Sequence, residues 1–597
     1  MTTATTRWRE PTVLAAATVA VGLGAGLGAV LFRELIVAVT RLLTGTDDYA
    51  ATPGAPLPWL PGAGPWFLVV VPVLGGLVYG PLVYRYAREA RGHGVPEVML
   101  AVAEHGGRIR PRVAVVKALA SAVCIGSGGS VGREGPIVQI GSALGSGVGQ
   151  WLRMPTRRLR LLVACGAAGG ISATFNAPVA GVFFALEILL LDVSLVSFVV
   201  VATSSVVANT VARVAEGADT FLALPRYTVG SVGELPAFVV VGLVGGLVGV
   251  AFTRVLYGAE DVVDRIWRGP EWLRPAVGGV VLGLLLVALP QMYGVGYPVL
   301  EQAVTGGYAV AFLLVLLVGK LVATSLTLAI GGSGGVFAPA LFLGAMTGSV
   351  LGAGTDALGV GSADAVALVG TAAVLAGSTR APVTAVVIVA EITAEWALVL
   401  PLMIAVAVAT VVSRLLSPET VYTEKLARRG IRLRAPGTPL WARRTVGDAL
   451  GPPEADPAGP PALGGTGESL GPVRWSEVLD ADHDLGGALD VLERAGSATL
   501  PVLAADGSRL LGLVGAADLV GRPADDRVDR AHEPDARCVV ELVEDPPEGW
   551  TPPSGFRRLE GPDGVHLLVG PCAGLDTLVA GLATTPDKPP DGTPDRT

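Results

Sequence analysis

The sequence is poor in charge and in cysteine for its 597 residues. Only 16% of the residues are charged and 51% are hydrophobic, with a mean hydropathy of +0.59. This composition excludes a chain built mainly of soluble domains. The four cysteines, Cys124, Cys165, Cys538 and Cys572, form neither a CxxC pair nor a spacing typical of metal ligands. We therefore expect no disulfide and no metal site. The net charge of −8 argues against a nucleic-acid partner.

Motifs of common enzyme classes are also missing. Gly126–Gly135 superficially resembles a phosphate-binding loop, but it lacks the Gly-Lys-Ser/Thr ending and precedes no nucleotide-binding sheet. The sequence contains no HExxH motif and no recognisable Ser/His/Asp set. We therefore expect neither an enzyme nor a primary pump, and no catalytic cofactor.

Long apolar runs dominate the chain before residue 417. Runs of bilayer length predict an all-α polytopic membrane protein over residues 11–416, with halves at about 11–215 and 236–416. These runs are Pro11–Leu31, Trp66–Val83, Leu195–Val214, Ala237–Val255, Ala276–Pro290, Ala309–Ile330 and Trp396–Val412.

Other apolar pieces are too short to cross a bilayer and are flanked by glycine or proline. They predict broken or re-entrant helices, which are tolerated at membrane depth only when buried in protein or lining a polar cavity. These pieces are Val113–Ile125, Ile137–Val148, Pro339–Leu351 and Ala381–Ala390.

Arginines in the loops predict the orientation, because positive residues in short loops stay cytoplasmic. Arg7 and Arg9 precede the first run, and six arginines lie within residues 85–112, whereas Thr44–Pro65 contains no lysine or arginine. Basic residues also follow the last run between positions 425 and 434. We expect a multi-pass protein of the plasma membrane, in contact with the lipid bilayer, with both termini in the cytoplasm.

The two halves of the membrane part repeat each other. Lys117 and Pro136 in the first half match Lys320 and Pro339 in the second at an offset of 203 positions (320 − 117). Glu187 and Glu391 continue the match at an offset of 204 positions (391 − 187). Repeats interrupted by glycine and proline at corresponding places indicate paired broken helices that hold an ion near the bilayer midplane.

Four segments predict helix N-termini suited to an anion. Three combine glycine with an early proline, and their unpaired N–H groups carry about half a positive charge at each helix start. Several such ends converging on one point would favour a small anion without binding it irreversibly; the alternative is that they are only tight turns. The segments are Gly92–Pro96, Gly132–Pro136, Gly335–Pro339 and Ser417–Tyr422.

These residues resemble the CLC family of chloride channels and proton–chloride exchangers. Gly126–Pro136 is similar to the family's GREGP element, Gly335–Pro339 to its GxFxP element, and Phe175–Glu187 to its next long motif. The resemblance covers nearly the whole membrane part. It implies bound chloride ions, a homodimer with one anion path per subunit, and two inverted halves around each path.

The resemblance also implies roles for individual residues. Glu134 is similar to the gating glutamate, whose carboxylate would compete with chloride for helix N–H groups until it is protonated; a buried ion pair with Arg133 is the alternative. Backbone N–H groups of Val336 and Phe337, with those around Arg133–Gly135, would form the anion cradle. The Tyr422 hydroxyl would be a donor on the cytoplasmic side.

Two positions depart from the family pattern. His93 stands where many members have serine, so it would either bind the anion and add pH sensitivity or only line the inner vestibule. Ile188 stands where family exchangers carry a second glutamate that delivers protons from the cytoplasm. Because isoleucine carries no proton, we interpret the chain as a gated chloride channel, with a proton-coupled chloride exchanger as the alternative.

Two further acids lie inside the membrane part. Glu187 and Glu391 are candidates for a proton path by their position. Their symmetric placement in the repeat favours a structural hydrogen-bonding role instead, and the same holds for Lys117 and Lys320.

The chain after residue 416 has a different composition. We expect a cytoplasmic linker over 417–472, a small α/β domain over 473–583 and a disordered tail over 584–597. Strands at Thr499–Ala504 and Leu510–Val514 and helices at Leu485–Ala495 and Ala516–Val520 are predicted, and this unit resembles a CBS motif with a degenerate second copy. The resemblance makes Asp518 a weak candidate for binding an adenine nucleotide, against a purely structural or dimer-stabilising role.

Overall fold

The computed structural model describes residues 4–59, 61–191, 194–217, 234–358 and 362–431, together with six strands between Leu479 and Pro571. The chain forms two compact units, Met1–Leu433 and Arg434–Thr597. The first unit is helical. It includes residues 417–431, which the sequence analysis assigned to the linker, because Tyr422 and Leu426 are buried within it.

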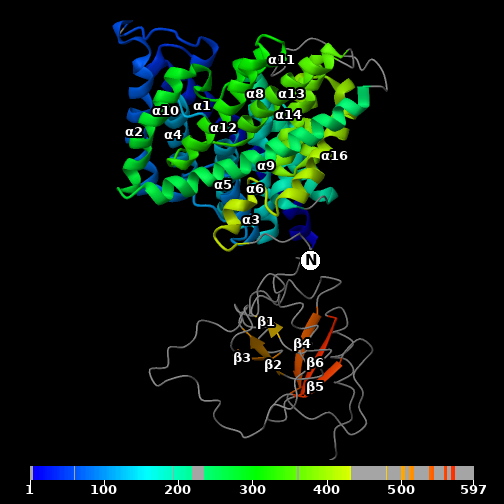
Figure 1. Ribbon diagram of the computed structural model, residues 1–597. Coiled ribbons are helices and arrows are strands. Elements are labelled where there is room, and N and C mark those ends of the chain that lie inside the picture. Colours follow the sequence, from blue (N-terminus) through cyan, green and yellow to red (C-terminus); the bar gives the residue numbers. More distant parts are fainter. Residues whose placement is uncertain are drawn as a thin grey trace, which may run out of the picture. The chain divides into compact units, whose positions relative to one another are not determined.

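Eight helical segments in the described part are long and apolar enough to cross a membrane. Seven correspond to the predicted runs, most with ends within a few residues of those expected. Their helices are α1 (Ala4–Thr44), α2 (Phe67–Tyr86), α8 (Leu195–Glu216), α9 (Leu235–Ile266), α10 (Arg274–Ala288), α12 (Val310–Ala329) and α16 (Val399–Leu416). Figure 1 shows α2 beside α10 at one end of the unit and α16 near the other.

The eighth segment, α13 (Phe337–Ala357), corrects the sequence analysis, which treated Pro339–Leu351 as too short to cross a membrane. The helix begins before Pro339 and continues to Ala357, because other helices of the unit surround most of it. Of its most apolar window, 78% is buried inside the unit, against 39–50% for the other seven segments. Helix α13 is therefore central.

The remaining helices are mostly shorter and lie between the long ones. They are α3 (Val95–Ala103), α4 (Arg112–Gly126), α5 (Glu134–Trp151), α6 (Thr156–Phe175), α7 (Pro178–Phe184), α11 (Tyr297–Val304), α14 (Ala363–Thr379), α15 (Pro382–Thr393) and α17 (Thr423–Ala427). A π-helical turn over Ala185–Leu190 follows α7.

Repeat-related helix pairs pack in the same way. Helix α5 packs on α6 where Gly141 meets Gly166, and a Cβ atom on Gly166 would collide with the Gly141 carbonyl oxygen. Helix α13 packs on α14 at the equivalent residues, where a Cβ atom on Gly370 would lie 2.8 Å from the Gly344 carbonyl oxygen. Small residues let membrane helices approach closely and gain dispersion energy. The repeated glycines thus fix the same close packing in both halves.

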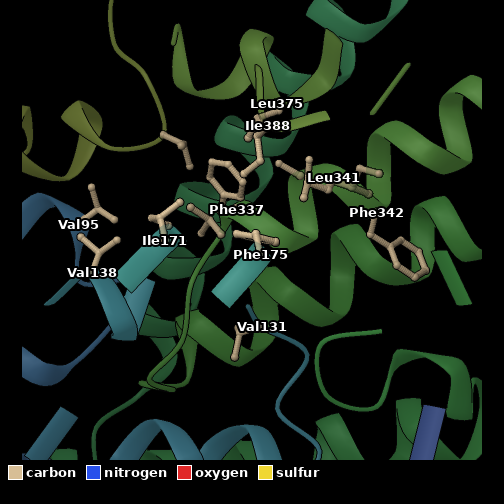
Figure 2. Close-up of a cluster of buried hydrophobic side chains, with 14 of the residues drawn as sticks. Val95, Val131, Val138, Ile171, Phe175, Phe337, Leu341, Phe342, Leu375 and Ile388 are labelled. Carbon is tan, nitrogen blue, oxygen red and sulfur yellow. The ribbon is translucent and has the colours of Figure 1, made fainter. Parts of the chain in front are cut away.

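The apolar core of this unit reaches the broken helices themselves. Figure 2 shows Phe337, at the start of α13, beside Phe175 and Ile171 and close to Ile388. All four side chains are at least 98% buried. The start of α13 is therefore enclosed by apolar side chains, which keep the local dielectric low and strengthen electrostatic interactions there.

The second unit is described only through its strands. Strands β1 (Leu479–Asp480), β2 (Thr499–Leu503) and β3 (Leu510–Gly515) form one sheet, with β1 parallel and β3 antiparallel to β2. Strands β4 (Arg537–Leu542), β6 (His566–Pro571) and β5 (Arg557–Glu560) form an antiparallel sheet in that order. Strands β2 and β3 lie close to the predicted ranges. The predicted helices of this unit, Asp518 and the expected tail lie outside the described residues.

Candidate anion site

Three glycine-rich loops meet at the centre of the first unit. The first and second precede α3 and α5, and the third precedes α13. Gly132 and Gly335, equivalent positions of the repeat, exchange backbone hydrogen bonds in both directions, at 2.8 and 2.6 Å. Gly92 donates to the Gly332 carbonyl at 3.1 Å. Backbone hydrogen bonds thus connect the loop before α5 to the loop before α13, and a further one connects the loop before α3 to the loop before α13.

Two buried lysines hold loop carbonyls. Lys117 donates to the carbonyl oxygens of Ala90 and Gly92, at 2.9 and 2.7 Å. Lys320 donates to those of Gly294 and Val295, at 3.2 and 2.8 Å, and also to the Ser130 hydroxyl. Carbonyl groups in the loops between broken helices have no partner within a helix, and water would otherwise bind them. Each lysine ammonium provides these carbonyls with hydrogen-bond donors instead. The geometry agrees with the structural role expected for the repeated lysines.

Glu134 is the first residue of α5, and it is 1% exposed. Its Oε1 atom accepts a hydrogen bond from the Tyr297 hydroxyl. Its Oε2 atom accepts from the backbone N–H of Ala338, in the first turn of α13, at 3.3 Å. The carboxylate therefore accepts a hydrogen bond from one of the N–H groups that could otherwise bind an anion at the helix start.

The sequence analysis missed Tyr297. A signal was present, because Gly294-Val295-Gly296-Tyr297-Pro298 repeats the pattern of Gly92–Pro96 at an offset of 202 positions (298 − 96). Both outer glycines of each segment have positive φ values, 78° and 83° in the first and 63° and 90° in the second. The repeat therefore contains a second Gly-x-Gly-x-Pro turn, and it delivers a hydroxyl to Glu134.

Arg133 directly precedes Glu134 and lies near the Tyr297 ring. Its guanidinium donates to the Thr174 carbonyl at 3.2 Å and lies 5.5 Å from the centre of the Tyr297 ring. Arg133 and Tyr297 line a cavity of about 460 Å³, which we call the Arg133 cavity; Asp48 also lines it. Burial raises the pKa of Asp48, against the backbone hydrogen bond from Ala50.

The expected anion cradle lies at the adjoining helix starts. Val336 is the N-cap of α13, and Phe337 packs against Phe175 and Phe184 with ring centres 5.8 and 6.2 Å apart. At Gly135 a Cβ atom would collide with the His93 carbonyl oxygen, so only glycine permits this approach of the α5 start to the loop before α3. The cradle residues and His93 are therefore neighbours.

His93 and Tyr422 complete the group. Both are 1% exposed, and their ring centres lie 6.0 Å apart. His93 Nε2 lies 3.1 Å from the Tyr257 hydroxyl, which donates to the Val421 carbonyl at 2.7 Å. Among the residues that the structure describes, His93 Nδ1 has no hydrogen-bond partner.

A second cavity, of about 610 Å³, reaches Tyr257 and Gly92, and we call it the Arg428 cavity. Its wall is strongly charged. Lys425 lies 3.7 Å from Glu97, and Arg429 lies 2.9 Å from the same carboxylate. Burial lowers the pKa of Lys425, and the nearby Glu97 opposes this shift.

Glu187 and Glu391 lie at a separate place, where each caps a helix of the other half. Glu187 accepts from the backbone N–H groups of Val383 and Thr384 at 3.1 and 2.9 Å. Glu391 accepts from those of Val179 and Ala180 at 3.0 and 2.7 Å. Both carboxylates are thus used at the starts of α15 and α7. This reciprocal capping favours the structural role over a proton path.

The site combines helix starts, a buried acidic side chain and two flanking cavities within a helical membrane unit. The starts of α5 and α13 lie together with the rings of His93 and Tyr422 nearby, and a desolvated anion at these helix starts would find partial positive charge. Glu134 competes for the same region. These features define a membrane transport protein for a small anion.

Comparison with known proteins identifies the family. Residues 75–414 match the model of the voltage gated chloride channel family, and the chain belongs to this family. It is 33% identical to a putative chloride channel protein ClcB-like of Ralstonia nicotianae, over 70% of this chain and 97% of the relative. It is 36% identical to the H(+)/Cl(−) exchange transporter ClcA of Vibrio parahaemolyticus, over 58% of this chain and 76% of the relative. The resemblance to the CLC family is confirmed.

Solved structures share the fold. A slow cyanobacterial Cl−/H+ antiporter matches with a TM-score of 0.63 at 23% identity, over 70% of this chain and 98% of that one. A CLC-type fluoride/proton antiporter matches with a TM-score of 0.59 at 24% identity, over the same shares of the two chains. A eukaryotic CLC transporter matches with a TM-score of 0.58 at 21% identity, over 87% of this chain and 88% of that one. The chain is therefore a multi-pass membrane protein with the CLC fold, and the family to which it belongs transports chloride.

Proposed function

We propose that this chain exchanges chloride for protons across the plasma membrane. The observation that carries the proposal is the position of Glu134, whose carboxylate accepts a hydrogen bond from the Ala338 N–H group at the start of α13. A carboxylate and chloride compete for such a donor, and a protonated carboxyl does not compete as an anion. One side chain therefore links chloride occupancy to proton occupancy.

The gating step follows from the two hydrogen bonds of Glu134. When the carboxylate takes a proton, its charge-assisted bond to the Ala338 N–H weakens and chloride takes that donor instead. The neutral side chain swings toward the Arg133 cavity, where it exchanges its proton with water. We propose backbone N–H groups of Gly135, Val336 and Phe337 as the anion ligands, with His93 and Tyr422 on the side of the Arg428 cavity.

The named relatives support exchange rather than the channel that the sequence analysis preferred. Several relatives at 34–36% identity are named H(+)/Cl(−) exchange transporters. Ile188 favours the channel as the second candidate, since it is 5% exposed and cannot deliver a proton. The ClcB-like relative, named a putative chloride channel protein, supports the same candidate.

The proposal also includes the side of the membrane that each cavity faces and the oligomeric state of the protein. The arginines of residues 85–112 support a cytoplasmic location of the Arg428 cavity, and the loop after α1, which lacks lysine and arginine before residue 65, supports an external location of the Arg133 cavity. A homodimer is the expected assembly.

Proton pumping in vesicles tests the proposal. Purified protein is reconstituted into liposomes, and an outward chloride gradient is imposed while the internal and external pH are recorded. Exchange predicts uphill proton movement into the vesicles as chloride leaves. Chloride movement without any uphill proton movement would favour the channel. Vesicles without protein serve as the control.

A further inference from the structure

His93 lies next to residues that line the Arg428 cavity and next to the start of α5. Its hydrogen-bond partner Tyr257 and its chain neighbour Gly92 both line the cavity, while its carbonyl abuts Gly135, which follows the gating glutamate. Its ring lies 6.0 Å from that of Tyr422. The side chain of His93 thus contacts the cavity wall through Tyr257, and its backbone contacts the residue that follows Glu134.

The hydrogen-bond network fixes the proton on the His93 ring. The Tyr257 hydroxyl has a single hydrogen, which it donates to the Val421 carbonyl at 2.7 Å. It therefore accepts from His93 Nε2, which must carry the ring proton in the neutral form. Nδ1 then carries a lone pair. In the described part of the chain nothing donates to that lone pair, although it is buried.

A buried lone pair without a donor is a proton acceptor, and imidazole is the side chain whose charge changes near neutral pH. The exchange cycle needs such a group, because Ile188 stands where exchangers of the family use an acid. Tyr257 is the positioning residue: its hydrogen bond holds the ring and keeps Nδ1 free.

We propose that His93 Nδ1 carries the proton between the Arg428 cavity and Glu134. This inference rests on the proposed exchange of chloride for protons. A hydronium ion from the cavity gives one proton to Nδ1, which leaves water and an imidazolium. The imidazolium then gives that proton through water to the Glu134 carboxylate, which leaves neutral His93 and a neutral carboxyl. One proton enters and one proton leaves the ring in each cycle.

The surrounding charges make this step depend on chloride. Lys117 lies behind the loop of His93, and Lys425 and Arg429 line its cavity side, paired with Glu97. Arg428 lies 4.9 Å from the Tyr257 ring centre, and Glu260 lines the same cavity. The excess of positive charge opposes an imidazolium, and a bound chloride would offset it. Proton uptake at His93 should therefore follow anion entry.

The test compares wild type with His93→Gln and Tyr257→Phe in the reconstituted full chain. Glutamine keeps an N–H donor for Tyr257 but does not titrate. We expect the ratio of proton flux to chloride flux to fall by about tenfold or more in H93Q, as is usual when a positioned proton-transfer group is lost. In Y257F the ratio should fall less, with a shift in its dependence on pH at the Arg428 cavity side. Size-exclusion profiles and thermal melting identify variants that fail to fold.

A second substitution separates the proton role from anion binding. In the double variant H93Q with Ile188→Glu, an acid at the position used by family exchangers should restore proton flux, which a purely structural role of His93 would not allow. If wild type pumps protons and H93Q keeps its flux ratio and pH profile, this inference is wrong and the proposed exchange stands. If wild type itself pumps no protons, the proposed exchange fails and the inference fails with it.

Discussion

At the residue scale, three glutamates of the membrane unit differ in burial and in their hydrogen bonds: Glu134 is buried, whereas Glu187 and Glu391 are partly exposed. Each oxygen of Glu187 and of Glu391 accepts a hydrogen bond from a backbone N–H group. Glu134 is held by one hydroxyl and by one N–H group at 3.3 Å. Charge-assisted bonds contribute about 1.5–3 kcal/mol each, and the bond from the Ala338 N–H group is the longest of the N–H bonds to these three carboxylates. Glu134 is therefore held less firmly by the backbone than the two capping glutamates.

Glu134→Gln should open the path permanently. A neutral amide does not compete with chloride for the Ala338 N–H group, so chloride flux should rise by about tenfold, equivalent to about 1.4 kcal/mol of removed competition. Its pH dependence should flatten and proton pumping should stop. Chloride efflux from liposomes between pH 4 and 8 measures this, with Tyr297→Phe as a milder partner that loses only one bond to the carboxylate. Unchanged flux and pH response in E134Q would remove Glu134 from the gating role.

At the element scale, the broken helices are stable because side chains of each half form hydrogen bonds with unpaired backbone groups of the other half. Lys117 and Ser333 donate to the Ala90 carbonyl of a loop, and glutamates of one half cap helices of the other. Such interactions replace the water that an interrupted helix would need in a bilayer. The halves therefore depend on each other for folding, and neither helix α7 nor α15 has an equivalent cap within its own half in the described structure.

Glu187→Gln and Glu391→Gln should both destabilise the protein, by about 1–3 kcal/mol each, since each weakens two charge-assisted caps. We expect lower melting temperatures in detergent for both variants, with a similar size of effect because the contacts are reciprocal. Glu301→Gln, a change at the wall of the Arg133 cavity, is the matched control. A variant with unchanged melting but lost proton pumping would instead assign its glutamate to the proton path.

At the scale of the whole molecule, the site is contained in the first unit. The described site residues lie between Gly92 and Tyr422, and the unit ends at Leu433. The ClcB-like relative is matched over 97% of its length by only 70% of this chain. Chloride transport should therefore not require residues 434–597.

A chain ending after Leu433 tests this expectation. It should retain chloride flux within about twofold of the full chain, because a factor of two is about 0.4 kcal/mol and no described site contact is lost. Both forms are reconstituted at equal protein density and compared by chloride efflux. Loss of flux from a folded, truncated protein would show that the second unit acts on the transport path. Size-exclusion chromatography separates this outcome from misfolding.

The sequence predicted most of the helices and the central group of residues, because these features depend on residues that are close together in the chain. Apolar runs specify spans, and glycine and proline specify where helices break. It placed α13 among the short pieces, because burial by neighbouring helices extends a helix beyond its most apolar core. It also missed Tyr297, since a tyrosine beside Gly-x-Gly does not reveal which carboxylate its hydroxyl reaches.

The sequence by itself thus determined the membrane class, the repeat, the chloride family and Glu134 as the acid at a helix start. Only the tertiary structure decided what each acid and base contacts. It assigned Glu187 and Glu391 to the helices of opposite halves and joined Tyr297 to Glu134. Within the described residues, it left His93 with one ring nitrogen bonded and one without a partner. The physical reason is that these contacts join residues far apart in the chain, so only the packing of the two halves brings donor and acceptor together.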